Sequence, residues 1–181
     1  MNQSFIFIII SLIFFNFIYP SYYFFLPSIP IYPDNRQESL FVLQSLREIS
    51  SLEKEFFYLT NPSVSHAFLP LVNENIDELN KIISEPSSLI KTLKYSINRA
   101  RPEQVNYSIK PIDTSTAKTP AFPAGHAFQA YYLTKKLSKK YPEKKSEFEK
   151  IAYQCDLIRV KAGLHYPSDG AFSKYLVEAF Y

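Results

Sequence analysis

Two basic side chains, Lys94 and Arg101, stand seven residues apart in a segment with helical patterning, and Pro102 follows directly. Seven residues are two turns of an α-helix, so the spacing predicts that both cations face one pocket. Lysine offers a mobile point charge and arginine a planar fork of donors, a pair suited to binding several oxygens of one phosphate. We expect Arg99, which lies between them, to be an ordinary solvated residue. Taken alone, this block also fits a solvated helix face.

A histidine occurs where a long loop is predicted to turn into a helix, in the segment 122–127 that reads Phe-Pro-Ala-Gly-His-Ala. A helix N-terminus presents free backbone N–H groups and the positive end of its dipole to an anion. Gly125 allows the backbone to approach a ligand closely, and His126 can protonate a leaving-group oxygen. A single histidine at a helix start is also often structural, so this block is weak by itself.

A second histidine, His165, lies between Arg159 and Asp169. We interpret this segment as a helix end, a tight turn at Pro167 and a new helix that starts near Asp169. A carboxylate bonded to one ring nitrogen fixes the imidazole tautomer and leaves the other nitrogen free to attack. The simpler interpretation of this block alone is an aspartate that caps a helix beside an incidental histidine.

Three such patterns in this order are expected by chance in fewer than roughly one in 1,000 sequences. Together they resemble the type 2 phosphatidic acid phosphatase and vanadium haloperoxidase superfamily, which includes bacterial class A acid phosphatases. The motifs of that superfamily are Lys-x6-Arg-Pro, Pro-Ser-Gly-His and Ser-Arg-x5-His-x3-Asp. The first is complete here, and the resemblance covers roughly residues 38–180. The other two motifs are matched at Pro123, Gly125, His126, Arg159, His165 and Asp169.

The resemblance implies an all-α domain in which His165 attacks phosphorus to form a phosphohistidine, with Asp169 orienting the imidazole. His126 would protonate the departing alcohol and then activate the water that hydrolyses the intermediate. This chemistry requires no metal or other cofactor, and vanadate would act as an inhibitor. Four groups would hold the equatorial oxygens of the phosphoryl group: Lys94, Arg101, Arg159 and the amide of Gly125.

Two alternative functions use the same residues. The pocket could hold vanadate as the cofactor of a haloperoxidase, although members with that activity are usually much larger. The chain could also be a pseudoenzyme that binds phospholipid headgroups without turnover, because Ala124 and Ile158 stand where the motifs have serine. A lost neutral hydrogen bond is worth about 0.5–1.5 kcal/mol, which slows turnover roughly three- to tenfold. We therefore favour a weakened but active enzyme.

Helical patterning dominates the chain after residue 38, and no alternating strand pattern competes with it. The predicted fold is therefore all-α, a single bundle of about six helices that must bring the three blocks together. The helices are expected over about 38–59, 63–83, 86–99, 126–140, 143–164 and 169–180.

The first 26 residues are predicted to be a hydrophobic membrane anchor. From Phe5 to Leu26 no residue is charged, and the length matches one membrane thickness. A cleaved signal peptide, which would give a secreted or lumenal protein, is the alternative, but no Lys or Arg precedes the apolar run and no small-x-small site follows it. Residues 27–37 are predicted to form a proline-rich linker, and residues 38–181 the phosphatase-like domain.

The net charge of +3 and the pI near 8.8 suit an anionic substrate but fall short of a nucleic-acid-binding surface. The expected partners are a phosphorylated lipid or a small phosphate monoester, and a membrane through the N-terminal segment. No Cys/His cluster has the spacing of a zinc site. The single cysteine, Cys155, is expected to be buried in a helix without a chemical role.

Overall fold

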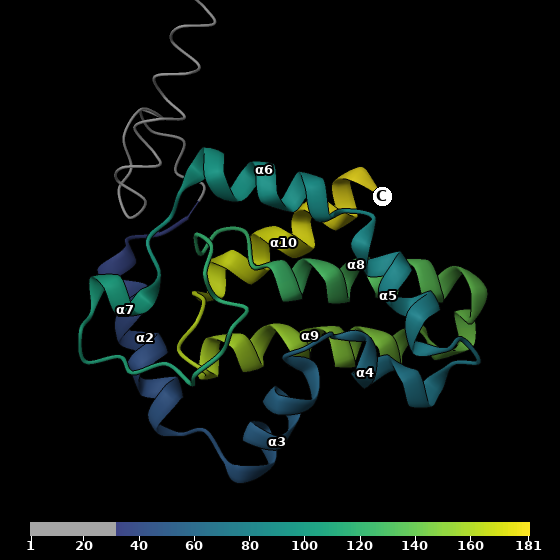
Figure 1. The fold of residues 1–181 in the computed structure, drawn as a ribbon, viewed down its shortest axis with the longest axis horizontal. Coiled ribbons are helices and arrows are strands. Elements are labelled where there is room, and N and C mark those ends of the chain that lie inside the picture. Colours follow the sequence, from purple (N-terminus) through teal and green to yellow (C-terminus); the bar gives the residue numbers. More distant parts are fainter. Residues whose placement is uncertain (1–31) are drawn as a thin grey trace, which may run out of the picture.

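The computed structural model describes residues 32–181, and within this range the chain forms α-helices and short 3₁₀ turns without any strand (Figure 1). The predicted all-α fold class is therefore confirmed for this part of the chain. The predicted anchor, residues 1–26, and the first residues of the linker lie outside the described residues. Among residues 32–181, no helix combines the length and the apolar character needed to cross a membrane.

The prediction of a single helix over 38–59 is wrong, because two helices occupy this region. α2 (Asn35–Arg47) starts inside the predicted linker, since the Asp34 side chain accepts two backbone N–H groups of its first turn. α3 (Ser51–Thr60) starts at a reciprocal capping box, in which Ser50 and Glu53 each bond the backbone N–H of the other. These caps satisfy the free N–H groups of a helix start, and they outweigh a continuous apolar periodicity.

The helix expected over 63–83 is likewise interrupted. α4 (Ser65–Phe68) runs into the 3₁₀ turn η1 (Leu69–Leu71), which contains Pro70. α5 (Ile76–Ser84) then starts afresh at Asn75, whose side chain accepts two backbone N–H groups. A proline without an N–H and a strong N-cap residue together divide the segment.

α6 (Ser87–Ile97) ends before the expected residue 99, because Asn98 adopts a left-handed conformation (φ 52°) that terminates the helix. α7 (Pro102–Val105) is a single turn that the sequence did not indicate. A long connection then leads to α8 (Gly125–Lys140), which begins one residue before its predicted start.

The 3₁₀ turn η2 (Pro142–Lys144) joins α8 to α9 (Lys145–Lys161). α9 stops short of the expected residue 164, and Gly163 follows with a positive φ of 79°. α10 (Pro167–Phe180) begins two residues before the expected position.

α8 and α9 lie side by side along the long axis of the molecule, with α6 and α10 on one side of the pair and α3 and α4 on the other (Figure 1). Cys155 is buried in α9, as predicted. Apolar side chains between α8, α9 and the α4–α5 region form one core cluster, which includes Val64, Phe68, Leu79, Leu133 and Phe148. A second cluster joins α6, α8 and α10 through Ile90, Phe128, Tyr132, Leu176 and Val177.

Candidate active site

Hydrogen bonds join the starts of α8 and α10 and the segment after α6. The backbone N–H of Ala124 donates to the carbonyl of Asp169 at 3.2 Å, and the Ser173 hydroxyl bonds the carbonyl of Ala124 at 3.1 Å. The backbone N–H of Ala121 donates to the carbonyl of Arg99 at 2.9 Å. The three sequence blocks therefore meet at one end of the bundle.

His165 lies in the turn between α9 and α10, with only 3% of its surface exposed. Its Nδ1 lies 3.2 Å from Oδ2 of Asp169, which also accepts the backbone N–H of Tyr166 at 2.9 Å. Because an ionised carboxylate can only accept, this network assigns the imidazole proton to Nδ1 and leaves a lone pair on Nε2. Asp169, the third residue of α10, thus contacts both the backbone N–H of Tyr166 at the helix start and the imidazole of His165.

The other ring nitrogen of His165 faces Arg101. Nε2 lies 3.4 Å from NH1 of Arg101, and the guanidinium also donates to the carbonyls of Leu164 at 2.7 Å and Thr119 at 2.8 Å. Burial lowers the pKa of His165 well below its usual value, and the charge of Arg101 lowers this pKa further. The imidazole is therefore neutral at pH 7.

Lys94 reaches this end of the bundle from α6. Its Nζ donates to the carbonyls of Pro120 at 2.6 Å and Ala121 at 3.3 Å. Burial, helped by the charge of Arg101, lowers the pKa of Lys94 to about 7. The predicted helical spacing is not the reason for the convergence, because α6 ends at Ile97 and Arg101 stands beyond it in an extended conformation.

Arg159 and His126 share a partner that lies outside the motifs, Asn61 at the end of α3. NH1 of Arg159 donates to the side-chain oxygen of Asn61 at 2.9 Å, and Nε2 of His126 lies 3.0 Å from its backbone oxygen. The Thr116 hydroxyl accepts from NH2 of Arg159 at 3.0 Å. Asn61 belongs to none of the three sequence motifs.

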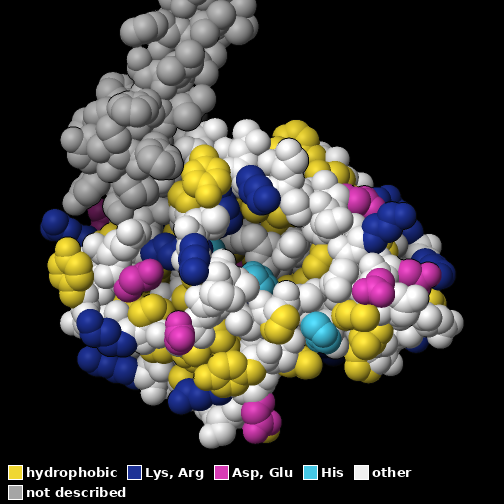
Figure 2. Space-filling model, viewed as in Figure 1, with side chains coloured by type: hydrophobic (Ala, Val, Ile, Leu, Met, Phe, Trp, Pro, Cys, Tyr) yellow, Lys and Arg dark blue, Asp and Glu magenta, His cyan; other side chains and the backbone are white. Residues whose placement is uncertain are grey.

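The site is strongly electropositive. Burial lowers the pKa of His126 to about 3, with a contribution from the charge of Arg159. Burial also lowers the pKa of Arg159 to about 9, and its buried Nε has no hydrogen-bond partner among residues 32–181. Figure 2 shows a hollow near the centre of this face, with histidine and basic side chains around it. A bound anion would raise all these pKa values, because negative charge favours the protonated forms.

Gly125 provides the first residue of α8. Its backbone N–H has no hydrogen-bond partner within the described part of the chain. A Cβ at this position would lie 3.8 Å from Lys94 and Ile90, an ordinary contact distance. The packing of the protein itself does not require glycine here, whereas the close approach of an anion to the N–H group would.

The prediction that Arg99 is solvated is wrong, because only 1% of its surface is exposed. Its guanidinium donates to Oδ1 of Asp169 and to Oε2 of Glu38, both at 2.6 Å. Periodicity misplaced this residue because α6 ends before it and the chain changes direction at Asn98. Arg99 therefore belongs to the surroundings of the candidate nucleophile.

The two positions at which the motifs have serine are both buried. Ala124 is the N-cap residue of α8 and makes no side-chain cap. Ile158 packs into an apolar cluster with Phe57, Ala162 and Leu164, so it belongs to the core. A serine would therefore stand at a helix start at position 124 and in the apolar core at position 158.

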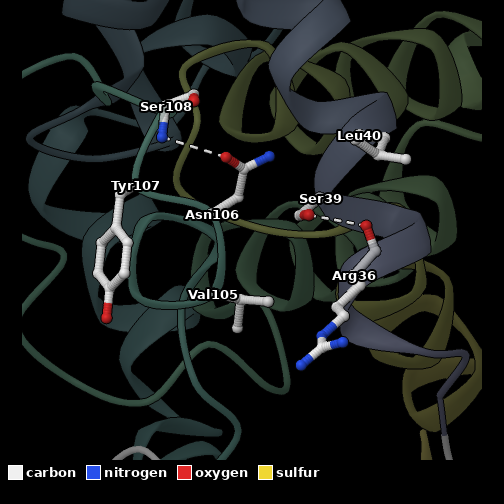
Figure 3. Close-up of a pocket in the computed structure, with 7 residues that line it drawn as sticks. All are labelled: Arg36, Ser39, Leu40, Val105, Asn106, Tyr107 and Ser108. Atoms are coloured by element: carbon white, nitrogen blue, oxygen red, sulfur yellow. Dashed lines mark hydrogen bonds between the residues drawn. The ribbon is translucent and has the colours of Figure 1, made fainter.

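A separate groove of about 440 Å³ lies between α2 and the segment that follows α7 (Figure 3). None of the predicted site residues lines this groove. Its lining contains one charged side chain, Arg36, whereas the cluster described above contains several. Among residues 32–181, no group of His, Cys, Asp and Glu side chains could hold a metal ion. The groove is lined by Arg36, Ser39, Leu40, Val105, Asn106, Tyr107 and Ser108.

No protein-family model matches the chain, and no curated protein matches its sequence.

Proposed function

We propose that the protein is a metal-independent phosphatase that hydrolyses phosphate monoesters through a phosphohistidine at His165. The observation that carries the proposal is the chain of contacts from Asp169 through the imidazole of His165 to Arg101. The carboxylate holds Nδ1 at 3.2 Å, and Nε2 faces a guanidinium 3.4 Å away. A neutral imidazole with an oriented lone pair beside a buried cation is suited to attack on an anionic phosphate ester.

In the first step, Nε2 of His165 attacks phosphorus and the bond to the alcohol oxygen breaks. The bound ester raises the pKa of His126, so that the imidazole takes up a proton from solvent and then donates it to the leaving oxygen. In the second step, neutral His126 accepts a proton from water, the water oxygen bonds to phosphorus, and the bond to Nε2 breaks. Negative charge on the three equatorial oxygens is stabilised by Lys94, Arg101, Arg159 and the amide of Gly125.

The favoured substrate is a lipid phosphate such as phosphatidic acid. This part of the proposal is supported by the uncharged run from Phe5 to Leu26, which would act as a single-pass anchor and hold the site near a bilayer. The test compares release of phosphate from phosphatidic acid in mixed micelles with release from a small soluble ester. Hydrolysis of the soluble ester alone would remove the lipid from the proposal and leave the reaction type intact.

The reaction type is tested by trapping the phosphoenzyme during turnover of a radiolabelled ester. The quench should be an alkaline detergent, because the phosphorus–nitrogen bond of phosphohistidine survives at high pH. We expect label on the native protein and on His66→Ala, and none on His165→Ala. His66 is the matched control, since its ring contacts the Ser63 carbonyl at 3.0 Å and it belongs to none of the three motifs. Phosphate binding without label or turnover would instead indicate a binding protein.

A further inference from the structure

We propose that Arg99 is a positioning residue, which keeps Asp169 deprotonated and thereby holds His165 in the tautomer that can attack phosphorus. Its importance for catalysis rests on the proposed function. The protonation state of His165 can be measured without turnover, so the two proposals can fail separately.

Arg99 occupies one oxygen of Asp169 and leaves the other for the histidine. Its NH1 donates to Oδ1 at 2.6 Å, whereas Oδ2 receives the Tyr166 amide at 2.9 Å and faces Nδ1 of His165 at 3.2 Å. The side chains of both Arg99 and Asp169 are fully buried. The ion pair is therefore shielded from water and from salt.

The guanidinium of Arg99 is held on its edges and on both faces. Its carbon lies 3.9 Å from the ring centroids of Tyr32 and Tyr166, so it is stacked between two aromatic rings. Its edges donate to Asn35 at 2.9 Å and to Ser168 at 2.7 Å. A planar fork of donors fills this enclosure in a way that a lysine ammonium could not.

Removal of the Arg99 charge should place a proton on Asp169 and change which ring nitrogen of His165 is protonated. Burial raises the pKa of Asp169, and the charge of Arg99 is the largest opposing influence. A buried carboxylate that loses its ion-pair partner takes up a proton. Protonated Asp169 would donate to Nδ1 of His165, and the imidazole proton would then reside on Nε2, which would lose its contact with the donor NH1 of Arg101. The ring stays neutral, but Nε2 no longer has a lone pair with which to attack.

Three partners of Arg99 come from the first described residues of the chain: Tyr32, Asn35 and Glu38. Glu38 also accepts the backbone N–H of Ser168 at 3.0 Å, which ties the start of α2 to the start of α10. The region that follows the apolar N-terminal segment in the sequence thus supports the nucleophile.

The test is ¹⁵N NMR of the His165 ring in the full-length protein. In the native protein we expect a protonated Nδ1 and an unprotonated Nε2, and in Arg99→Gln a protonated Nε2. Arg47→Gln is the matched control, because Arg47 is exposed in α2 and has no ion pair among the described residues. Arg99→Gln with an unprotonated Nε2 would overturn the proposal.

Should Arg99→Gln fail to fold, the ¹³C signal of the Asp169 carboxyl in the native protein decides the matter. We expect an ionised carboxylate at pH 7, and a protonated one would refute the role assigned to Arg99. For the folded variant we expect kcat to fall about 10³-fold or more, the scale of loss caused by a wrong histidine tautomer. Sulfate affinity should change little, by less than about threefold, since Arg99 does not face the anion.

A purely structural role for Arg99 would lower the melting temperature and leave the tautomer and the kcat of the folded fraction unchanged. That result would also overturn the proposal. If Arg99→Gln showed the expected tautomer change but the native protein had no phosphatase activity, only the proposed function would fail.

Discussion

Asn61 holds Arg159 with its side-chain oxygen at 2.9 Å and approaches Nε2 of His126 with its backbone oxygen at 3.0 Å. The end of α3 therefore contacts one member of each of two distant motifs. The oxygens of Asn61 thus accept from donors of two side chains of the candidate site.

Changes at Asn61 should weaken anion binding through Arg159. Asn61→Ala removes one acceptor and should reduce sulfate affinity roughly three- to tenfold, because Arg159 loses its orientation. Asn61→Asp should reduce this affinity more than about tenfold, since its carboxylate pairs with Arg159 and repels the anion. Isothermal titration calorimetry measures both, with Asn73→Asp, an exposed position, as the control for added charge. Equal losses of sulfate affinity in Asn61→Asp and Asn73→Asp would argue against a specific role for Asn61.

The leaving group should determine how strongly His126→Ala affects phosphorylation of the protein. We expect an alkyl phosphate to react about 10²–10⁴-fold more slowly, because its alkoxide needs a proton as it departs. The rate of phosphorylation by nitrophenyl phosphate should fall far less, since nitrophenolate leaves without protonation. Rapid-quench measurements should also show accumulated phosphoenzyme, because water activation is lost. A similar loss with both esters would exclude His126 as the general acid.

Sulfate affinity should depend on pH through Lys94. The pKa of Lys94 in the free protein is lowered to about 7, so the lysine is charged below this pH and neutral above it. Sulfate keeps its charge over this range and prefers the protonated site, so its affinity should be highest below pH 7 and should fall as the pH rises. The decline should disappear in Lys94→Met and persist in Lys91→Met, an exposed position on the same helix. An unchanged pH profile in Lys94→Met would contradict this assignment.

Restoring serine should have opposite effects at the two positions that depart from the motifs. Ala124 has an extended conformation (φ −71°, ψ 108°) suited to an N-cap, so Ala124→Ser should stabilise the fold by about 0.5–2 kcal/mol. Its kcat should rise roughly three- to tenfold if the hydroxyl acts in the transition state. Ile158→Ser should destabilise the fold by about 2–5 kcal/mol, because it opens a cavity beside Phe57 and buries a hydroxyl. Urea unfolding and steady-state kinetics test both variants, and a stabilised Ile158→Ser would be inconsistent with the observed packing.

Two glycine substitutions should separate activity from stability. In Gly125→Ala the new methyl group fits at 3.8 Å from its neighbours, so stability should stay within about 1 kcal/mol while kcat/KM falls. In Gly170→Ala the new Cβ would lie 1.8 Å from Oδ1 of Asp156, which should cost about 1–3 kcal/mol. Thermal unfolding and ester hydrolysis measure the pair. Normal activity in Gly125→Ala would show that no ligand approaches this backbone.

Local properties were predicted from the sequence alone. The all-α class and the start of α8 followed from helical patterning, and the structure agrees with the class and, within one residue, with the helix start. The burial of Cys155 in a helix followed in the same way. Such features depend on neighbouring residues, so a single sequence contains the information. The roles assigned to His126 and His165 remain predictions, because they concern chemistry and not conformation.

The tertiary structure alone decided which polar groups are partners. Arg99 has the same local sequence signature as a solvated cation, and only the packing of α2 against the start of α10 buries it against Asp169. Asn61 lies outside the sequence motifs. Lys94 and Arg101 converge through the loop carbonyls that bind them, not through helical spacing. Burial and pairing arise between residues far apart in the chain, and no local pattern encodes those distances.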